Sequence, residues 1–255
     1  MRTKLCRALY PFVILAGLLA LTFVASAAED RDLEWRKISD RNGIQVYVSF
    51  DENSRLKKFR GITTMELPDE YAMVALYNDT PAFPLWLHMI DEASVLDDRS
   101  LLDRDMRFTI KLPWPLSDRE VLLNSKLVQV VTAEEESVTA YLEGNPELAP
   151  LDSRFVRTPE LHGVFRFERV EPGKVEATYQ ISADLGGYLP MWIVNFAFRD
   201  IPYFTLEKMQ RIVTKEKYQN RYYPELDLLG PGRPVSAGKP ASWIYDNPPA
   251  SSGGG

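Results

Sequence analysis

One stretch in the middle of the chain decides the fold: Asp103 to Val131, which reads DRDMRFTIKL, then PWPLSDRE, then VLLNSKLVQVV. From Met106 to Leu112 apolar side chains alternate with polar ones, the period of a strand that has one buried and one solvated face. Pro113 and Pro115 cannot donate to a β-ladder, so the PWP tripeptide predicts a stiff corner. The apolar, β-branched run from Val121 predicts a second strand. The stretch therefore reads as a hairpin with an aromatic corner.

Other segments on both sides of this hairpin also show strand or helix patterns. Strands are predicted at 44–50, 58–65, 137–143, 163–169 and 174–184. Short helices are predicted at 33–38, 68–77 and 82–88. Strand parity places two phenylalanines on one face with three residues of the next strand beside them: Phe165, Phe167, Ala177, Tyr179 and Ile181. Gly186 and Gly187 end the sheet.

The pattern turns helical from Pro190 to about Tyr218, where apolar residues recur at a spacing of 3.6. Pro202 lies inside this stretch. Because proline removes one amide donor and crowds the preceding turn, the sequence predicts a kink or break near Asp200. A helix with one apolar stripe can cover the apolar face of an antiparallel sheet.

The octapeptide PWPLSDRE at 113–120 resembles a signature of START domains, the steroidogenic acute regulatory-related lipid transfer family. The resemblance extends to GIQVY at 43–47, to KFRG at 58–61 and to the helical segment from Pro190, and so covers roughly 33–223. It implies an α+β, START-like helix-grip fold, in which a curved antiparallel sheet wraps around a long C-terminal helix. It also implies a cavity for one lipid between the sheet and that helix.

The resemblance, combined with the strand parity and the helical stripe, gives a set of candidate ligand-binding residues. They are Phe83, Trp86, Met106, Phe108, Ile110, Phe165, Tyr179, Ile181, Val194, Phe198 and Ile201. For each of them the alternative is ordinary core packing. Tyr179 and Tyr141 are candidate hydroxyl anchors for a ligand, although Tyr141 alternates with the apolar residues of its own strand. Gly186, Gly187 and Pro202 bracket a segment that is a candidate lid.

The N-terminal residues have the composition of a secretory leader. Three positive charges precede an apolar run from Ala8 to Ala25, and Ala25-Ser26-Ala27 fits a cleavage site. We therefore expect a signal peptide at 1–27, a START-like ligand-binding domain at 28–223 and a probable disordered Pro- and Gly-rich tail at 224–255. The protein would be periplasmic or secreted, and the alternative is a membrane anchor formed by an uncleaved leader.

Charge and cysteine content exclude several classes of function. Without the leader, 27 basic residues face 36 acidic ones, a net charge of −9, which argues against nucleic acid as a partner. The single cysteine, Cys6, lies in the leader, so the mature chain has no disulfide and no thiol nucleophile. His88 and His162 lack the spacing of a metal site, and no catalytic or nucleotide-binding motif is present. We expect no catalytic residue, no metal and no cofactor.

Asp118 and Arg119 are neighbours on a strand and point to opposite faces, so they do not form an acid and base pair. We expect Asp118 to fasten the turn and Arg119 to tie the corner to a neighbouring acid. The leading hypothesis is a monomeric, non-enzymatic protein that binds or transfers one lipid or other hydrophobic small molecule, with transient membrane contact. The alternatives are a cyclase- or aromatase-like enzyme, and an interaction module with a vestigial pocket that docks a partner through loop 145–158 or the tail.

Overall fold

The computed structural model describes residues 34–50, 56–67, 69, 71–133, 135–187, 189, 191–221, 223 and 225–226, without the side chains of residues 50 and 191–198. The predicted signal peptide at 1–27 lies outside the described residues, as does nearly all of the predicted tail.

Within the described residues, ten strands form a single sheet with the order β1-β2-β3-β10-β9-β7-β6-β5-β4, and β8 pairs with β6 beside this path. The strands are β1 (Trp35–Arg41), β2 (Ile44–Phe50), β3 (Lys57–Glu66), β4 (Ile90–Ser100), β5 (Asp103–Ile110), β6 (Arg119–Val131), β7 (Glu136–Gly144), β8 (Val156–Arg157), β9 (Glu160–Glu171) and β10 (Lys174–Asp184). Neighbouring strands are antiparallel except for the short parallel pair of β6 and β8.

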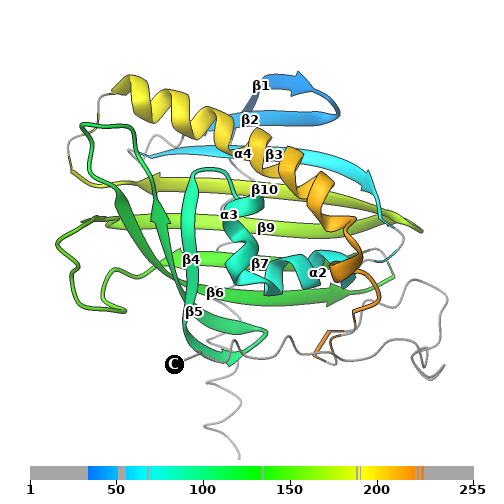
Figure 1. Cartoon of the computed structure of the whole chain (residues 1–255). Helices are drawn as coiled ribbons and strands as arrows, with labels where there is room; N and C mark the ends of the chain where they lie inside the picture. Colours follow the sequence, from blue (N-terminus) through cyan, green and yellow to red (C-terminus); the bar gives the residue numbers. More distant parts are fainter. Residues whose placement is uncertain are drawn as a thin grey trace, which may run out of the picture.

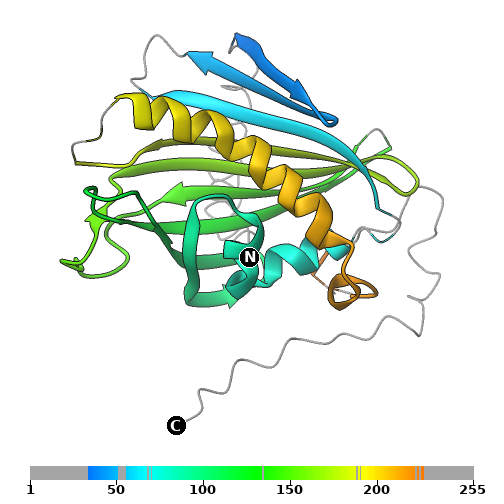
Figure 2. The ribbon, with the colours of Figure 1, turned by 45° about the horizontal axis from the view of Figure 1, so that its top comes forward.

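The helices lie on one face of the sheet (Figures 1 and 2). They are α2 (Tyr71–Asn78), α3 (Phe83–Trp86) and α4 (Met191–Val213), with 3-10 turns η1 (Thr80–Ala82) and η2 (Glu216–Tyr218). Helix α4 runs diagonally over the sheet and contacts β2, β3 and β10, and it also contacts α2 and α3. The hydrophobic core lies between this helical layer and the sheet.

The structure confirms the hairpin at the centre of the sequence and the strand parity around it. Strand β5 pairs with β6 so that Met106 faces Leu123 and Phe108 faces Val121, all of them buried. On the neighbouring strands Phe167 lies opposite Ala177, and Phe165 lies opposite Tyr179. The apolar side chains that alternate along these strands therefore meet on the face that the helices cover.

The helix predicted at 33–38 is wrong, because Trp35 to Ile38 belong to edge strand β1. Strand β1 pairs with β2 through a two-residue turn at Asn42 and Gly43, whose φ angles are +53° and +74°. Asn-Gly is the preferred sequence for such a turn because both positions need a positive φ. The guanidinium of Arg60 lies 3.9 Å from the centre of the Trp35 ring, which fixes the start of the strand.

Two other differences concern segments next to α3. Helix α2 begins at Tyr71, three residues later than predicted, and the Asp69 carboxylate accepts a hydrogen bond from the Tyr71 amide at 3.1 Å. Strand β4 was not predicted. It is an edge strand with three register shifts and little burial, so it lacks the alternation that identifies the other strands.

Helix α4 is continuous through Pro202, so a break near Asp200, one of the two predicted outcomes, is wrong, whereas a kink there stays a prediction. Close packing holds the helix at this point. A Cβ atom on Gly61 of β3 would lie 2.9 Å from the Pro202 Cβ and 2.8 Å from the Leu206 Cδ1. The glycine lets the helix approach the strand backbone closely, and that contact stabilises the helix where proline removes a hydrogen bond.

Candidate functional site

The candidate site is an apolar pocket between the sheet, the α3–β4 connection and α4. Its lining comes from the ends of β5, β6, β7, β9 and β10, from residues 87–90, and from the helix. The lining residues are Leu87, His88, Met89, Ile90, Phe108, Ile110, Val121, Leu123, Leu142, Leu161, Tyr179, Ile181, Ala183, Leu185 and Ile201. None of these residues carries a carboxylate, an ammonium or a guanidinium group.

Two polar side chains line this apolar pocket. The Tyr179 side chain is buried, and no described residue forms a hydrogen bond to its hydroxyl group. Burial alone raises the pKa of Tyr179 above its ordinary value, so the hydroxyl stays protonated. The Nδ1 atom of His88 is also buried without a hydrogen-bond partner among the described residues. The pocket therefore holds two polar atoms whose hydrogen-bonding capacity is unused.

His88 is positioned by contacts to helix α4. The Thr205 hydroxyl accepts a hydrogen bond from the His88 backbone amide at 3.1 Å, and the imidazole lies 4.9 Å from the Phe204 ring, measured between centroids. Burial, reinforced by the positive charge of Lys208, lowers the pKa of His88 from its ordinary value, while Asp200 acts in the opposite direction. The imidazole is therefore neutral at pH 7.

The pocket brings together some of the predicted ligand-binding residues. Phe108, Ile110, Tyr179, Ile181 and Ile201 line it. Phe83, Trp86, Met106 and Phe165 are buried beside it in the core. The side chains of Val194 and Phe198 lie outside the described residues.

Three of the buried residues beside the pocket, Phe83, Trp86 and Phe165, belong to an aromatic cluster. The Phe83 ring lies 5.0 Å from Trp86 and 5.7 Å from Phe108, and the Trp86 ring lies 5.5 Å from Phe165, all between centroids. Tyr77 joins the cluster and shares a hydrogen bond of 2.6 Å with the Ser125 hydroxyl. The indole Nε1 of Trp86 is buried without a partner among the described residues. These rings fill much of the space between helices and sheet.

The pocket that remains has a volume of about 50 Å³. That volume holds a few water molecules, whereas pockets for drug-sized ligands are ~300–1,000 Å³. A lipid-sized ligand therefore requires the lining to move apart.

The corner between β5 and β6 lies at the end of the pocket. Arg119 precedes the lining residue Val121 by two positions on the same face of β6, and its side chain is buried. Its guanidinium donates to the carbonyls of Ser117, Leu185 and Gly186, the last two at 3.3 Å and 3.1 Å. The predicted acidic partner of Arg119 is wrong. Backbone carbonyls bind the group instead, and they tie the corner to the connection between β10 and α4.

Asp118 fastens the corner as predicted, because its carboxylate accepts a hydrogen bond from the Leu112 amide at 3.0 Å. Gly186 and Gly187, which end the sheet as predicted, have φ angles of +67° and +64°. The Trp114 side chain at the tip of the corner is 92% exposed. The corner therefore combines a buried anchor, Arg119, with an aromatic side chain in solvent.

Loop 145–158 covers the other face of the sheet beside this corner. The buried carboxylate of Glu120 pairs with Arg107 at 2.6 Å and with Arg157 at 2.7 Å. The Arg157 guanidinium also donates to the carbonyls of Ala149 and Pro150 at 3.0 Å and 2.8 Å. The loop is thus folded around one guanidinium group and attached to β6.

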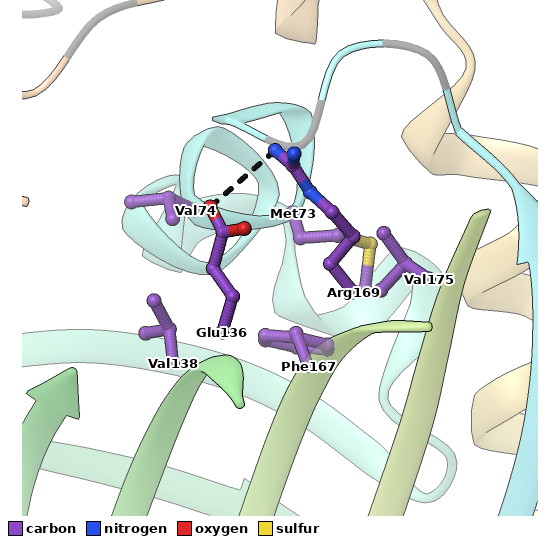
Figure 3. Close-up of a pocket in the computed structure, with 7 residues that line it drawn as sticks. All are labelled: Met73, Val74, Glu136, Val138, Phe167, Arg169 and Val175. Carbon is purple, nitrogen blue, oxygen red and sulfur yellow. Dashed lines mark ion pairs between the residues drawn. The ribbon is translucent and has the colours of Figure 1, made fainter. Parts of the chain in front are cut away.

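A second, smaller pocket lies between α2 and the opposite end of the sheet (Figure 3). Its volume is about 20 Å³, the space of one water molecule. The Arg169 Nη2 atom lies 3.4 Å from the Glu136 Oε1 atom, and both side chains are largely buried. We attribute this pocket to the packing of α2 on β7, β9 and β10.

Several lining residues were not among those predicted from the sequence. His88 and Met89 lie in the connection to the unpredicted strand β4, and Ile90 begins that strand, so no pattern in the sequence places them at the pocket. Leu142 and Leu161 lie at apolar positions of the alternating pattern in their strands, so strand parity alone could have placed them on the pocket face. Tyr141 is half-buried and is not among the residues that line the pocket, in agreement with its alternate parity.

The described residues contain no group of three or more His, Cys, Asp and Glu side chains that is arranged to hold a metal ion. His162 lies on the surface, where its ring nitrogens lie 3.0 Å and 3.1 Å from carboxylate oxygens of Glu143 and Glu160. In the described part of the chain, no helix is both long and apolar enough to span a membrane.

Comparison with known proteins finds similar folds among solved structures. No protein-family model matches the chain. An uncharacterised protein of Pseudomonas aeruginosa is 28% identical, over 78% of this chain and 98% of that protein. A STAR-related lipid transfer protein of Xanthomonas axonopodis superposes with a TM-score of 0.63 at 26% identity, over 71% of this chain and 99% of the other. Human StAR-related lipid transfer protein 5 superposes with a TM-score of 0.64 at 15% identity, over 78% and 96%.

The two superpositions cover 71% and 78% of this chain. The chain therefore contains a START-like domain, built on the fold of the StAR-related lipid transfer proteins.

Proposed function

We propose that this protein binds or transfers one hydrophobic small molecule, without covalent chemistry, in the pocket between the sheet and α4. The observation that carries the proposal is the pocket itself, which is lined by apolar side chains from the sheet, the α3–β4 connection and the helix. The names of the solved relatives, STAR-related lipid transfer protein and StAR-related lipid transfer protein 5, agree with this class of ligand.

In this proposal the sheet curves around α4 in the helix-grip arrangement, and the predicted ligand-binding residues divide between two roles. Phe108, Ile110, Tyr179, Ile181 and Ile201 already line the pocket and would contact the ligand first. The buried side chains Phe83, Trp86, Met106 and Phe165 contact it when the pocket enlarges. Val194 and Phe198 remain candidate contacts from the sequence alone. Such a mechanism needs no catalytic residue, metal or cofactor.

Ligand entry requires the first part of α4 to move. Gly186 and Gly187 precede the helix with positive φ angles, and Pro202 lies where the helix rests on Gly61. We propose that the segment from 190 to 201 is the lid and that these positions bracket it. Hydrogen exchange tests the lid. Amides of 191–201 are expected to exchange faster than those of β9 and β10, and equal protection would contradict the lid.

Apolar burial favours uptake of a ligand from water, but it does not by itself select the ligand. A ligand that buries about 400 Å² of apolar surface gains on the order of 10 kcal/mol relative to water, at ~25 cal/mol per Å². Most of that gain disappears relative to a membrane, because the bilayer interior is equally apolar. Selectivity and release therefore depend on polar contacts and on the cost of opening the lid.

We also propose that the protein is exported as a monomer, with residues 1–27 removed, and that it contacts membranes transiently through the corner around Trp114. Tryptophan favours the membrane interface, where its ring is half in an apolar environment, and a side chain that is 92% exposed is free to reach it.

Native mass spectrometry of the mature protein, residues 28–255, tests the proposed function. The protein is purified from its exported compartment without detergent. A discrete added mass that organic extraction removes is the expected result, and it would also identify the ligand. A bare protein mass, together with no uptake from mixed lipid vesicles, would contradict the proposal.

A second candidate function is an interaction module with a vestigial pocket. The observation in its favour is the aromatic cluster, which leaves a pocket of about 50 Å³. In that case loop 145–158, with Leu151 82% exposed, is the proposed contact for a partner. The same mass spectrum separates the two candidates, because a vestigial pocket takes up no ligand.

A further inference from the structure

The inference drawn here rests on the proposed function and concerns the polar chemistry of the ligand. We propose that the pocket selects an uncharged amphiphile with one small hydrogen-bonding group, and that Tyr179 and His88 bind that group. Lipids with a carboxylate, phosphate or ammonium head group are excluded from the pocket by the same contacts.

The first argument is the absence of a charged partner. None of the described residues that line the pocket carries a formal charge at pH 7, since burial favours the neutral imidazole of His88. Arg119 is the nearest cation in sequence on the pocket face of β6, but its guanidinium already donates to three backbone carbonyls. A charged head group that entered the pocket would lose its hydration without gaining an opposite charge, which is unfavourable.

The second argument is the two unused polar atoms. The Tyr179 ring stacks on Phe165 with centroids 4.1 Å apart and an interplanar angle of 6°, so its hydroxyl is held in place without a hydrogen bond to any described residue. The His88 Nδ1 atom is likewise buried without a partner in the described structure. Buried polar groups are normally satisfied, and exceptions need an explanation. A ligand that supplies the missing hydrogen bonds is the explanation we adopt.

The third argument identifies the kind of group. A tyrosine hydroxyl donates and accepts, whereas a neutral imidazole nitrogen does one or the other according to its tautomer. A ligand hydroxyl group can donate to one of these atoms and accept from the other, whichever tautomer His88 adopts. The Trp86 indole Nε1, also unpartnered among the described residues, offers one further donor beside the pocket. A long-chain alcohol or a sterol fits this pattern.

The test uses two pairs of probes that share an apolar skeleton: 1-hexadecanol with hexadecanoate, and cholesterol with cholesterol sulfate. Equilibrium binding of each radiolabelled probe, delivered from cyclodextrin, is measured with the mature protein. We expect the uncharged member of at least one pair to bind at least tenfold more tightly than its charged counterpart. Tyr179→Phe should weaken binding of that probe about tenfold, the effect of one hydrogen bond, and His88→Phe should weaken it similarly.

The control is Tyr141→Phe, which removes the same atom from a tyrosine outside the pocket and should leave binding unchanged. Tyr179→Phe removes no hydrogen bond to a described residue, so the variant should keep its fold, and thermal unfolding checks this. If both members of each pair bind alike, if the charged member binds more tightly, or if Tyr179→Phe has no effect, the inference is overturned while the proposed function stands. If no probe binds and the native mass spectrum shows no ligand, both are overturned.

Discussion

The rings of Phe165 on β9 and Tyr179 on β10 stack almost parallel, with centroids 4.1 Å apart and 6° between their planes. The two residues are direct partners in the antiparallel ladder. Phe165 also contacts Trp86 and Tyr77, so it connects the aromatic cluster to the pocket. The wall of the proposed ligand site and the centre of the core therefore share one pair of side chains.

This relationship predicts that Phe165→Ala both destabilises the protein and disturbs the pocket. Phe165 is buried, and truncation of a buried phenylalanine costs about 3–5 kcal/mol because it removes apolar contacts and leaves a cavity. Urea unfolding measures this change. Phe155→Ala is the control, since Phe155 lies half-buried in loop 145–158 beside Arg107 and Arg154. Equal losses for the two variants would contradict the central role of Phe165.

The sequence identified most of the sheet because its strands follow simple rules. Buried and less buried residues alternate along much of β5, β9 and β10, since one face of the sheet is buried and the other is more exposed. Edge strands β1 and β4 escape these rules because few of their side chains are buried. For β1 the sequence contains two conflicting patterns. Asn42-Gly43 indicates a hairpin turn, whereas residues 33–38 before it resemble a helix.

The sequence predicts fewer of the residues that line the pocket than of the strands that form the sheet. The pocket face of β5, β9 and β10 follows from parity, and these strands supplied Phe108, Tyr179 and Ile181. His88 was recognised only as a histidine without metal spacing, because its place depends on a contact with Thr205 on helix α4, far along the chain. The carbonyl ligands of Arg119 are equally non-local, and no side-chain pattern encodes a backbone carbonyl.

The contact of Gly61 with α4 predicts that even a methyl group is too large there. In Gly61→Ala the new Cβ would meet Leu206 Cδ1 at 2.8 Å and Pro202 Cβ at 2.9 Å. Overpacking of this kind costs about 1–3 kcal/mol, and we expect faster hydrogen exchange in α4. Leu206→Val relieves part of the clash, so the double variant should lose less stability than the sum of the two single variants. A strictly additive result would contradict the proposed contact.

Because Arg119 donates to carbonyls of both the corner and the connection before α4, we predict that this residue couples the two segments. Arg119→Met keeps the apolar stem but leaves the carbonyls of Ser117, Leu185 and Gly186 without their charged donor, so we expect a loss of about 3 kcal/mol. Hydrogen exchange should accelerate both at 113–118 and at 185–187.

Lys126→Met is the matched control for Arg119, because it removes an exposed positive charge from the same strand. Its free energy of unfolding should stay within about 0.5 kcal/mol of the wild type. Acceleration confined to one of the two segments in Arg119→Met would show that the guanidinium does not couple them.

His88 predicts a dependence of stability on pH. Burial lowers the pKa of His88 in the folded protein below its ordinary value of 6.5, so between these two pKa values the unfolded chain binds more protons than the folded one. Stability should therefore fall as the pH drops from 6.5 through the folded pKa. Thermal unfolding of His88→Gln across pH 5–8 should lack this contribution, and an unchanged profile would contradict the burial of a neutral imidazole.

His162 is the only other histidine in the sequence and should act in the opposite direction. A hydrogen bond to Glu143 raises the pKa of His162, so its stabilising contribution is complete below pH 6.5 and is lost as the pH rises through the folded pKa. The side chain is about half exposed, so solvent screening keeps the effect small. His162→Gln should lower stability slightly below pH 6.5 and leave it unchanged above the folded pKa, so the profile between these two pH values becomes flatter.

We predict that Trp114 contributes to membrane binding but not to folding stability. Because its side chain is 92% exposed, Trp114→Ala should change the free energy of unfolding by less than about 0.5 kcal/mol. Loss of an interfacial indole should weaken binding to neutral phosphatidylcholine vesicles severalfold, measured by co-sedimentation. Leu151→Ala removes another highly exposed apolar side chain and serves as the comparison. If Leu151→Ala alone weakens vesicle binding, the membrane contact lies on loop 145–158 and not on the corner that Arg119 anchors.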